Sequence, residues 1–393
     1  MALMALELVA FLGILTNLLT LINALRRLLM MDLSMAEVDG KTAAILPLTG
    51  RAARLGELCG RLDNQTAKLS ELLISVESTD DPSFGNACEV AATAQVPIRI
   101  VVAGLASDEG QKCRNQRVAL KQIPDSTDFI VLLDGDILPS RNWLQMLLTP
   151  LVTSHYDIVT GHRWHSAARP RLGAHLAVAI DRSMMLLPRL DLGAAQVTWG
   201  GSIAMSVDTA RRLDLSDCLQ RRLSDDLSIG IRASERGLRV ATRSALLIDS
   251  PVDHDVASAW RFGRRQYQIG KVYRPDLWLI ALGSLAVRAF AFGSAIALVI
   301  WYQNLLPLAI LALLGLLKQI LVSAVGARAG KPDPMSVRVI QYLLGVFQPA
   351  VDLFHLSIVV AAGWTRRIGW GHVTYDVTEP DRVRVIGRRP FSD

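Results

Sequence analysis

The longest apolar stretches of the chain lie near its two ends. At the N-terminal end, residues 8–25 read LVAFLGILTNLLTLINAL and carry no charge. A stretch of about 18 residues is close to the shortest helix that crosses a bilayer. Arg26 and Arg27 follow it, whereas a signal peptide carries its basic residues before the apolar part. The pattern predicts a membrane anchor, with a buried core helix as the alternative, and the positive-inside rule places the N-terminus outside and the following domain in the cytoplasm.

Apolar segments also dominate the C-terminal third. Residues 289–301 and 305–325 are joined by an uncharged turn and predict a helical hairpin that enters from the cytoplasm and returns to it. Residues 339–364 are apolar as well, but Pro349 and Asp352 interrupt them. A single crossing here would place the arginine-rich tail outside, against the positive-inside rule. We therefore expect a broken helix pair that re-enters or lies in the membrane interface.

Between these ends, strand-like and helix-like segments alternate. Short β-rich runs occur at positions 43–47, 72–77, 98–103 and 129–134. This alternation predicts an α/β domain with a mainly parallel sheet, whose ligands bind at the carboxyl ends of the strands. The expected parts are an N-terminal anchor, a cytosolic domain, C-terminal membrane helices and a cytosolic tail, with bounds 1–31, 32–276, 277–364 and 365–393.

The composition excludes several classes of protein. Of the 393 residues, 51% are hydrophobic and 20% are charged, and the mean hydropathy is +0.31. Soluble proteins usually contain about 25% charged residues. A disordered chain, a disulfide-rich mini-protein and a fully soluble cytosolic enzyme are therefore excluded, and the ordinary mixture within residues 32–276 excludes a pure multi-span transporter. We expect an integral protein of the inner (cytoplasmic) membrane.

The net charge limits the classes of binding partner, and the cysteine pattern indicates the redox compartment. The net charge is +6, from 42 Lys and Arg against 36 Asp and Glu, and a basic protein can bind nucleic acid, an anionic membrane or a phosphorylated substrate. The sequence has no basic run interleaved with aromatic residues, so nucleic acid is not an expected partner. The four cysteines are widely spaced and form no CxxC pair, as expected of reduced thiols in a domain that faces the cytoplasm.

The segment IVLLDGDILP at residues 130–139 is the sharpest chemical signal. Its apolar run predicts a buried strand that ends in Asp134 and Asp136, and side chains at i and i+2 of an extended backbone point the same way. Two carboxylates of this kind suit Mg2+ or Mn2+, which would in turn hold a diphosphate. The alternative is a solvated acidic turn, because Asp-Gly pairs are common in turns.

Two more acidic motifs stand beside predicted elements. Glu77 opens ESTDDP at the end of a predicted strand, and LSDDLSIG at residues 223–230 precedes a predicted helix. Capping this helix needs only one of Asp225 and Asp226, so the other is free to act as a general base on an acceptor hydroxyl. No glycine-rich GxGxxG or Walker loop follows the strands, which disfavours a dinucleotide oxidoreductase or a P-loop NTPase.

A cationic and aromatic segment, WRFGRRQYQIGKVYRPDLW, spans residues 260–278 directly before the C-terminal apolar part. Arg, Lys, Tyr and Trp are expected at a lipid interface whatever the function. The functional alternative is a cationic clamp on a leaving nucleotide diphosphate.

Taken together, these motifs resemble a membrane-bound family 2-type glycosyltransferase, most closely the ceramide glucosyltransferases and their bacterial relatives. The matching segments, in chain order, are ILPLTG (45–50), VESTDDP (76–82), GQKCRNQ (110–116), LLDGDILP (132–139), TWGGSIAMS (198–206) and LSDDLSIG (223–230). The resemblance implies one N-terminal anchor, a cytosolic nucleotide-sugar domain of the GT-A type and a hydrophobic C-terminal part.

The resemblance also implies roles for individual residues. In the donor half, Pro47 ends the first strand, Glu77 with Asp80 or Asp81 holds the nucleoside, and Lys112 approaches the nucleotide.

Around the reacting groups, the resemblance implies that Asp134 and Asp136 hold the metal and that Asp134 also faces the nucleotide sugar. Gly201, in the segment with the acceptor-side glycine, is a further candidate contact of the nucleotide sugar. Asp226 and Asp225 are the candidate catalytic residues, with Asp226 at the position of the catalytic base.

The (Q/R)xxRW motif of the family is degenerate here. RQYQI at residues 265–269 has Gln in place of Arg and Ile in place of Trp, and RFGRR at residues 261–265 ends in Arg. The candidate nucleotide-sugar contacts in this segment are Arg264, Arg265, Gln266 and Gln268. The missing Trp, together with too few spans for a secretion channel, argues against a processive polymer synthase.

The expected activity is inverting transfer of one sugar, glucose from UDP-glucose, to a lipid hydroxyl such as that of ceramide, with Mg2+ or Mn2+ as cofactor. The alternatives are another lipid or a polyprenyl phosphate as acceptor, and a non-catalytic membrane scaffold. A nucleotidyl or phosphate transferase could use the same Asp pair but would usually show a glycine-rich or lysine-rich phosphate loop. The expected partners are a UDP-sugar, a membrane lipid and the bilayer, and the sequence leaves the oligomeric state open.

Overall fold

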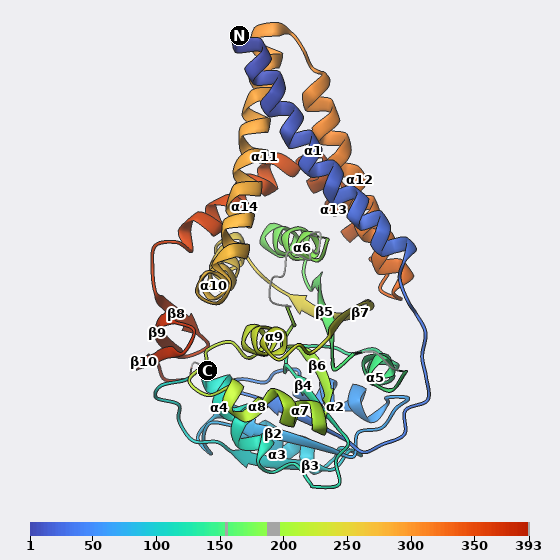
Figure 1. Ribbon diagram of the computed structural model, residues 1–393, viewed down its shortest axis with the longest axis vertical. Coiled ribbons are helices and arrows are strands. Elements are labelled where there is room, and N and C mark those ends of the chain that lie inside the picture. The colour runs from blue at the N-terminus through green and yellow to red at the C-terminus, as the bar shows by residue number, and fades with distance from the viewer. Residues whose placement is uncertain (154–155, 187–196, 392–393) are drawn as a thin grey trace. The chain divides into compact units, whose positions relative to one another are not determined.

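The computed structural model describes residues 1–153, 156–186 and 197–391, and the chain divides into two compact units (Figure 1). The first unit comprises Met1–Met31, Trp164–Leu192 and Pro251–Trp364. The second comprises Asp32–Arg163, Gly193–Ser250 and Thr365–Asp393. The sequence prediction placed all of residues 32–276 in one domain, whereas this division assigns two of its segments to the unit that contains the apolar ends.

A seven-stranded sheet forms the centre of the second unit, in the order β3-β2-β1-β4-β6-β5-β7. Strands β1, β2, β3 and β4 are mutually parallel, and β6 pairs antiparallel with β4 and β5. The strands are β1 (Thr42–Pro47), β2 (Glu71–Val76), β3 (Ile98–Val102), β4 (Phe129–Leu133), β5 (Ile158–Ala167), β6 (Ser202–Ser206) and β7 (Val240–Val252). The prediction of an α/β fold with a mainly parallel sheet is confirmed.

Successive residues of the central strands pack on opposite faces of this sheet. In β1, Ala44 and Leu46 belong to one apolar cluster, and Ala43 and Ile45 belong to another. Both clusters are fully buried, as expected of parallel strands covered on both faces, whose sequences read as continuous apolar runs. Helices that contribute to the two clusters are α2 (Leu55–Asp63), α3 (Pro82–Ala91), α4 (Gln111–Leu120), α5 (Trp143–Thr153), α7 (Val207–Leu213), α8 (Leu215–Cys218) and α9 (Asp225–Glu235).

The last part of the chain folds into a second, three-stranded sheet in the same unit, drawn in dark red in Figure 1. Its antiparallel strands are β8 (Arg367–Trp370), β9 (Val373–Glu379) and β10 (Arg382–Arg388). The Tyr375 hydroxyl accepts a hydrogen bond from the Gln111 backbone N–H at 3.1 Å, and the Val385 N–H donates to the Ser107 carbonyl at 2.8 Å. The sequence prediction gave residues 365–393 no structure, and Ser392, for which it implied a cytoplasmic location, lies outside the described residues.

The first unit contains the long apolar helices α1 (Ala2–Leu29), α11 (Pro275–Tyr302) and α12 (Leu306–Arg328), each long and apolar enough to cross a membrane. The two helices of the predicted hairpin are present, and residues 303–305 join them, with Gln303 at φ 52°; the side from which they enter a membrane stays a prediction. Helices α13 (Met335–Val346) and α14 (Gln348–Ala361) belong to a pair bent by 83°, which confirms the predicted break near Pro349.

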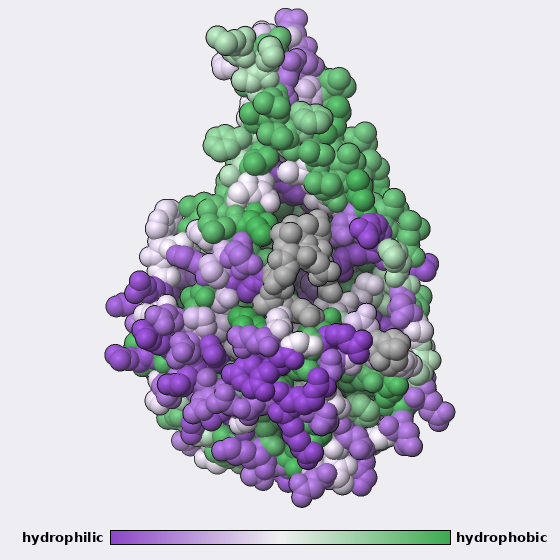
Figure 2. Space-filling model, in the orientation of Figure 1, coloured by the Kyte–Doolittle hydropathy of each residue, from purple (hydrophilic) through white to green (hydrophobic). Residues whose placement is uncertain are grey.

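The surface of the long helices is apolar, and Figure 2 shows hydrophobic side chains gathered over them. Large side chains such as Phe11, Phe290, Ile300, Trp301 and Leu306 are exposed. A water-soluble protein rarely exposes a contiguous apolar surface of this kind, so this unit is suited to a bilayer. The shorter helices α6 (Leu172–Met185) and α10 (Val256–Tyr273) pack on each other in the same unit.

Polar side chains are buried among the apolar helices. Lys318 Nζ donates to Gln348 Oε1 at 2.6 Å, and Gln348 Nε2 donates to Asp352 Oδ1 at 2.7 Å. The Arg288 guanidinium lies 3.9 Å from Asp352 and donates to the Thr20 hydroxyl at 2.8 Å. Ionisable groups within apolar helices are costly unless they are paired. The network therefore explains why Asp352 can interrupt an otherwise apolar stretch.

Candidate active site

The predicted site residues of the second unit come together at the carboxyl ends of the parallel strands. Asp134 follows β4 directly, Glu77 follows β2 directly, and Pro47 is the last residue of β1. Lys112 lies in the first turn of α4, which packs against β1 and β2. Because β1, β2 and β4 are parallel neighbours, their ends meet at one edge of the sheet, where open α/β sheets bind ligands.

Lys112 is the centre of a buried ionic cluster. Its Nζ lies 2.7 Å from Asp134 Oδ1 and 2.9 Å from Asp225 Oδ2. The amide of Gln116 also donates to Asp225 Oδ2, at 2.8 Å. Burial alone would lower the pKa of Lys112, but the adjacent carboxylates outweigh it and raise this pKa well above its ordinary value. Lys112 is therefore a fixed positive charge beside Asp134.

The helix that carries Asp225 and Asp226 begins differently from the sequence prediction. Ser224 occupies the N-cap position of α9, so neither aspartate is the N-cap residue. The Leu227 N–H is shared between the Ser224 hydroxyl at 3.4 Å and the Asp226 carboxylate at 2.8 Å. The backbone of Ser224 is extended, at φ −105° and ψ 120°, which is the conformation of an N-cap residue. Both aspartates lie in the first turn, where the helix dipole favours negative charge.

Asp225 and Asp226 have different surroundings. Asp225 is only 1% exposed and pairs with Lys112, so it is a fixed anchor for that lysine. Asp226 is partly exposed and accepts hydrogen bonds from the Leu227 N–H at 2.8 Å, the Gly200 N–H at 3.2 Å and the Ser224 hydroxyl. Burial raises the pKa of Asp226, and the charge of Asp225 raises it further against the opposing charge of Lys112. A partly exposed carboxylate with a raised pKa is suited to accept a proton.

Two glycines let the backbone of residues 198–201 approach this cluster. A Cβ on Gly200 would lie 2.7 Å from Lys112 Nζ and 3.1 Å from the Asp225 carboxylate. A Cβ on Gly201 would lie 2.1 Å from the Trp199 ring. The structure thus gives Gly201 a packing reason to be glycine, and its predicted role on the acceptor side stays a prediction.

Asp134 and Asp136 fit a divalent cation. Asp134 is partly buried and Asp136 is exposed. Burial raises the pKa of Asp134 to about 6 against the effect of Lys112, and the charge of Asp136 contributes to the rise, so the two carboxylates lie within electrostatic reach. Among the residues that the structure describes, no three His, Cys, Asp or Glu side chains form a metal cluster. Two carboxylates nevertheless suit Mg2+ or Mn2+, since Mg2+ is usually held by one or two carboxylates together with substrate phosphates.

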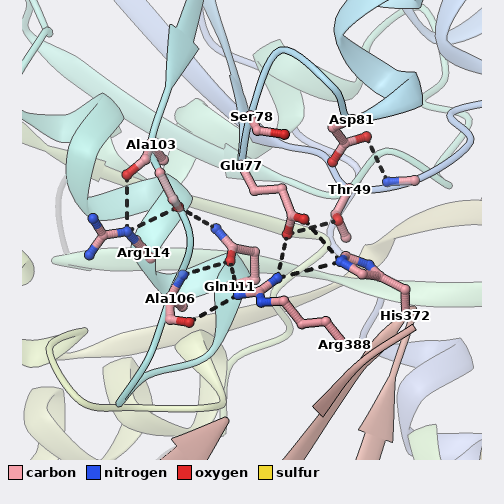
Figure 3. Close-up of polar contacts among 12 residues, drawn as sticks. Thr49, Glu77, Ser78, Asp81, Ala103, Ala106, Gln111, Arg114, His372 and Arg388 are labelled. Carbon is pink, nitrogen blue, oxygen red and sulfur yellow. Dashed lines mark hydrogen bonds and ion pairs between the residues drawn. The ribbon is translucent and has the colours of Figure 1, made fainter. Parts of the chain in front are cut away.

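Glu77 has an unexpected set of partners, shown in Figure 3. Its carboxylate lies 2.9 Å from His372 Nε2 and 3.0 Å from the Arg388 guanidinium, and the Thr49 hydroxyl lies 3.5 Å away. Glu77 is 2% exposed. The sequence analysis missed His372 and Arg388, because nothing in a single sequence indicates that two residues near its end reach the strand end at Glu77. The alternating pattern of VTYDVTE and RVRVIGR could have indicated the strands that carry them.

Asp80 and Asp81, the two aspartates of the ESTDDP motif, have different surroundings. Asp81 is buried and is the N-cap of α3 (Pro82–Ala91), accepting from the Ser83 N–H at 2.8 Å. It also accepts from the Gly50 N–H at 2.9 Å, which fixes the loop after β1 (Figure 3). Asp80 is exposed. Asp81 therefore has a structural role, and Asp80 is the more accessible of the two predicted nucleoside contacts.

The predicted contacts of the (Q/R)xxRW-like segment lie on α10, in the first unit. Arg264 Nε donates to the Ala361 carbonyl at 3.3 Å, and the Arg265 guanidinium lies 5.3 Å from the Phe262 ring centroid. Gln266 is exposed, and Gln268 is buried. The prediction that these four residues bind the nucleotide sugar stays a prediction.

Comparison with known proteins identifies one matching family and several distant structures. Residues 61–267 match the family described as Glycosyltransferase like family 2. No curated protein matches the chain.

Three solved structures show the level of structural similarity. The mannosyltransferase PcManGT from Pyrobaculum calidifontis, in complex with GDP-Man and Mn2+, is 16% identical and has a TM-score of 0.48 over 92% of this chain and 98% of its own. S. aureus TarS 1-349, in complex with UDP-GlcNAc, is 13% identical with a TM-score of 0.40 over 90% and 99%. Glucosyl-3-phosphoglycerate synthase from Mycobacterium tuberculosis is 15% identical with a TM-score of 0.34 over 60% and 80%. At TM-scores below 0.5, these similarities do not bear on the substrate or mechanism of this chain.

Proposed function

Since this chain belongs to the family described as Glycosyltransferase like family 2, we propose that it transfers a single sugar from a nucleotide diphosphate sugar to a hydroxyl of a membrane lipid. The observation that carries the proposal is the cluster of Lys112, Asp134 and Asp225 at the end of a buried strand, with Asp226 beside it. This arrangement combines a fixed positive charge, a carboxylate for a cation and a partly exposed base. A non-catalytic scaffold has no need of it.

In the proposed reaction, the acceptor oxygen attacks the anomeric carbon and the bond from that carbon to the diphosphate oxygen breaks. Asp226 accepts the hydroxyl proton as the new bond forms, and the electron pair of the broken bond leaves on the diphosphate. The displacement is direct, so the configuration at the anomeric carbon inverts. A divalent cation held by Asp134 and Asp136 would neutralise the diphosphate and make it a better leaving group. Lys112 adds a fixed positive charge on the same side.

The apolar unit supports a lipid as acceptor. Three of its helices are long enough to span a bilayer, and an enzyme that is held at the membrane meets its lipid substrate at a high effective concentration. We propose glucose from UDP-glucose as the transferred sugar and the hydroxyl of ceramide as the acceptor, as the sequence motifs imply. The cation is Mg2+ or Mn2+.

The test is transfer of a labelled sugar by the purified full chain. We expect label from a UDP-sugar panel to enter ceramide in mixed micelles containing Mn2+, with inversion at the anomeric carbon. Asp226→Asn protein, purified in parallel, is the matched control and should transfer sugar about 10²–10⁴-fold more slowly. Label that enters a polyprenyl phosphate instead would replace the proposed acceptor. Neither transfer nor hydrolysis with any nucleotide sugar would contradict the enzymatic function and favour a scaffold.

We also propose that the second unit faces the cytoplasm, and a separate experiment tests this topology. Cys59, Cys113 and Cys218 are buried and Cys88 is exposed, so Cys88 is the natural reporter for the side that the second unit faces. We expect an impermeant maleimide to label Cys88 only after the inner membrane has been made permeable, because the proposal places this unit in the cytoplasm. A Cys88→Ser chain is the control for residual labelling. Labelling of Cys88 in intact spheroplasts would reverse the orientation.

A further inference from the structure

Arg388, in the last strand of the C-terminal sheet, connects three separate segments of the second unit (Figure 3). One of its guanidinium nitrogens lies 3.0 Å from the Glu77 carboxylate, directly after β2. The other donates to the Ala106 carbonyl at 3.0 Å, after β3, and to Gln111 Oε1 at 2.8 Å, at the start of α4. A single side chain therefore fixes the loops that follow two neighbouring parallel strands.

The buried Glu77 carboxylate depends on this arrangement for its hydrogen-bond and ion-pair partners. The carboxylate is 2% exposed, and a buried carboxylate is strongly unfavourable unless it is paired and hydrogen-bonded. Arg388 contacts one of its oxygens, and His372 contacts the other at 2.9 Å. Both of these partners come from residues 365–391, whereas the Thr49 hydroxyl contacts the carboxylate more distantly, at 3.5 Å.

The same sheet also reaches the loop after β1. The His372 and Phe391 rings lie 4.3 Å apart, and a Cβ on Gly50 would lie 3.9 Å from the Phe391 ring. Gly50 is in turn held by Asp81. The ends of β1, β2 and β3 thus meet residues of the C-terminal sheet, at the edge of the main sheet where open α/β folds bind ligands.

We propose that the C-terminal sheet forms part of the donor site and that Arg388 and His372 are positioning residues for the nucleoside half of the donor. They act through Glu77, Gln111 and the loops after β2 and β3, whose geometry sets the shape of the nucleoside subsite. This inference rests on the proposed function, because it assumes a nucleotide-sugar donor. In this proposal, Glu77 and Arg388 jointly maintain the shape of the nucleoside subsite.

The experiment compares Arg388→Gln with Arg384→Gln in the full-length protein. Arg384 is an exposed residue of the same strand, so it controls for the loss of a positive charge. Loss of hydrogen bonds to a charged partner should weaken UDP binding and raise KM for the donor by about 10- to 100-fold. The kcat at saturating donor should stay within about twofold, since a residue used equally in ground and transition states changes only KM. Arg384→Gln should behave as the wild type.

A double-mutant cycle tests whether Arg388 acts through Glu77. Residues that act as one unit give non-additive effects, so Glu77→Gln combined with Arg388→Gln should bind UDP about as weakly as either single variant. If Arg388→Gln does not fold, His372→Gln replaces it, because glutamine can still donate to Glu77, and a milder rise in KM is expected. Melting temperatures of all variants accompany the binding data.

Two results would overturn the inference. One is that the Arg388→Gln variant has the same UDP affinity and the same KM for the donor as the wild type. The other is a fall in kcat that follows the folded fraction while KM stays constant, which would mark a purely structural role. UDP binding is measured without any transfer, so a wild type that binds UDP but transfers no sugar would contradict the proposed function and still allow the role of Arg388 to be judged.

Discussion

Asp226→Asn lowers the turnover of sugar transfer by about 10²–10⁴-fold, the usual contribution of a general base, while UDP binding stays close to that of the wild type. Asparagine keeps the shape of the side chain, and its one amide oxygen can still accept from the Leu227 N–H at the Oδ1 position. The Gly200 N–H, which bonds to the other carboxylate oxygen of Asp226, loses its acceptor. It cannot take the proton of the acceptor hydroxyl. Initial rates, UDP affinity and melting temperature, measured on one preparation, check this result.

The pH profile gives a second signature of the same residue. A base works only when it is deprotonated, and burial, followed by the charge of Asp225, raises the pKa of Asp226. The rate should therefore fall on the acidic side at a pH above the ordinary carboxyl pKa of about 3.9. This acidic limb should be absent in the residual activity of Asp226→Asn, and an unchanged limb would assign it to another group.

Asp225→Asn is the matched comparison and should behave differently. Asp225 is buried against Lys112 and Gln116, so the change removes one of the two carboxylates that hold the lysine. We expect a loss of stability of about 1.5–3 kcal/mol, typical of a hydrogen bond to a charged group, together with weaker donor binding. Equal and small losses of turnover in both variants would remove Asp226 from the mechanism.

Asp134→Asn should lower metal-dependent turnover by about 10²–10³-fold, because the leaving diphosphate loses several kcal/mol of stabilisation. Asp134 also holds Lys112 at 2.7 Å, so this variant loses both the cation and the position of the lysine. Asp136→Asn should be milder and should raise the concentration of Mn2+ that is needed for half-maximal rate. Transfer assays across a Mn2+ titration measure both effects.

An exposed aspartate outside the site provides the control for this experiment. Asp217 is 56% exposed and pairs only at the surface with Arg232, so Asp217→Asn should leave the Mn2+ titration unchanged. Full activity of the wild type in EDTA, or of both Asp134→Asn and Asp136→Asn without added metal, would contradict the metal assignment.

Local patterns were sufficient to predict most of the sheet. The strand before Asp134 was predicted from an unbroken apolar run, and such runs are typical of strands buried on both faces. Gly237 follows the end of α9 with a φ of 63°, a conformation that glycine adopts without strain. Information of this kind is carried by a few neighbouring residues.

The parts that could not be predicted depend on contacts between distant segments. The capping role of Ser224 was missed because three adjacent polar residues can all cap a helix, and only the backbone of the folded chain selects one. The partners of Glu77 lie 295 and 311 residues away along the chain. The bounds predicted from the sequence kept α6 and α10 with residues 32–276, whereas contacts in the folded chain group both helices with the apolar ones.

The position of the C-terminal sheet in the chain has a consequence for biosynthesis. Every helix of the apolar unit is translated before residues 365–391, yet these residues provide the partners of Glu77. Domains generally fold as units during synthesis, starting from the N-terminal side, but the second unit cannot be completed until the ribosome has passed the last apolar helix. A chain released early would keep its bilayer segments and leave the Glu77 carboxylate without its guanidinium. Completion of this unit therefore requires that all the apolar helices have already been translated.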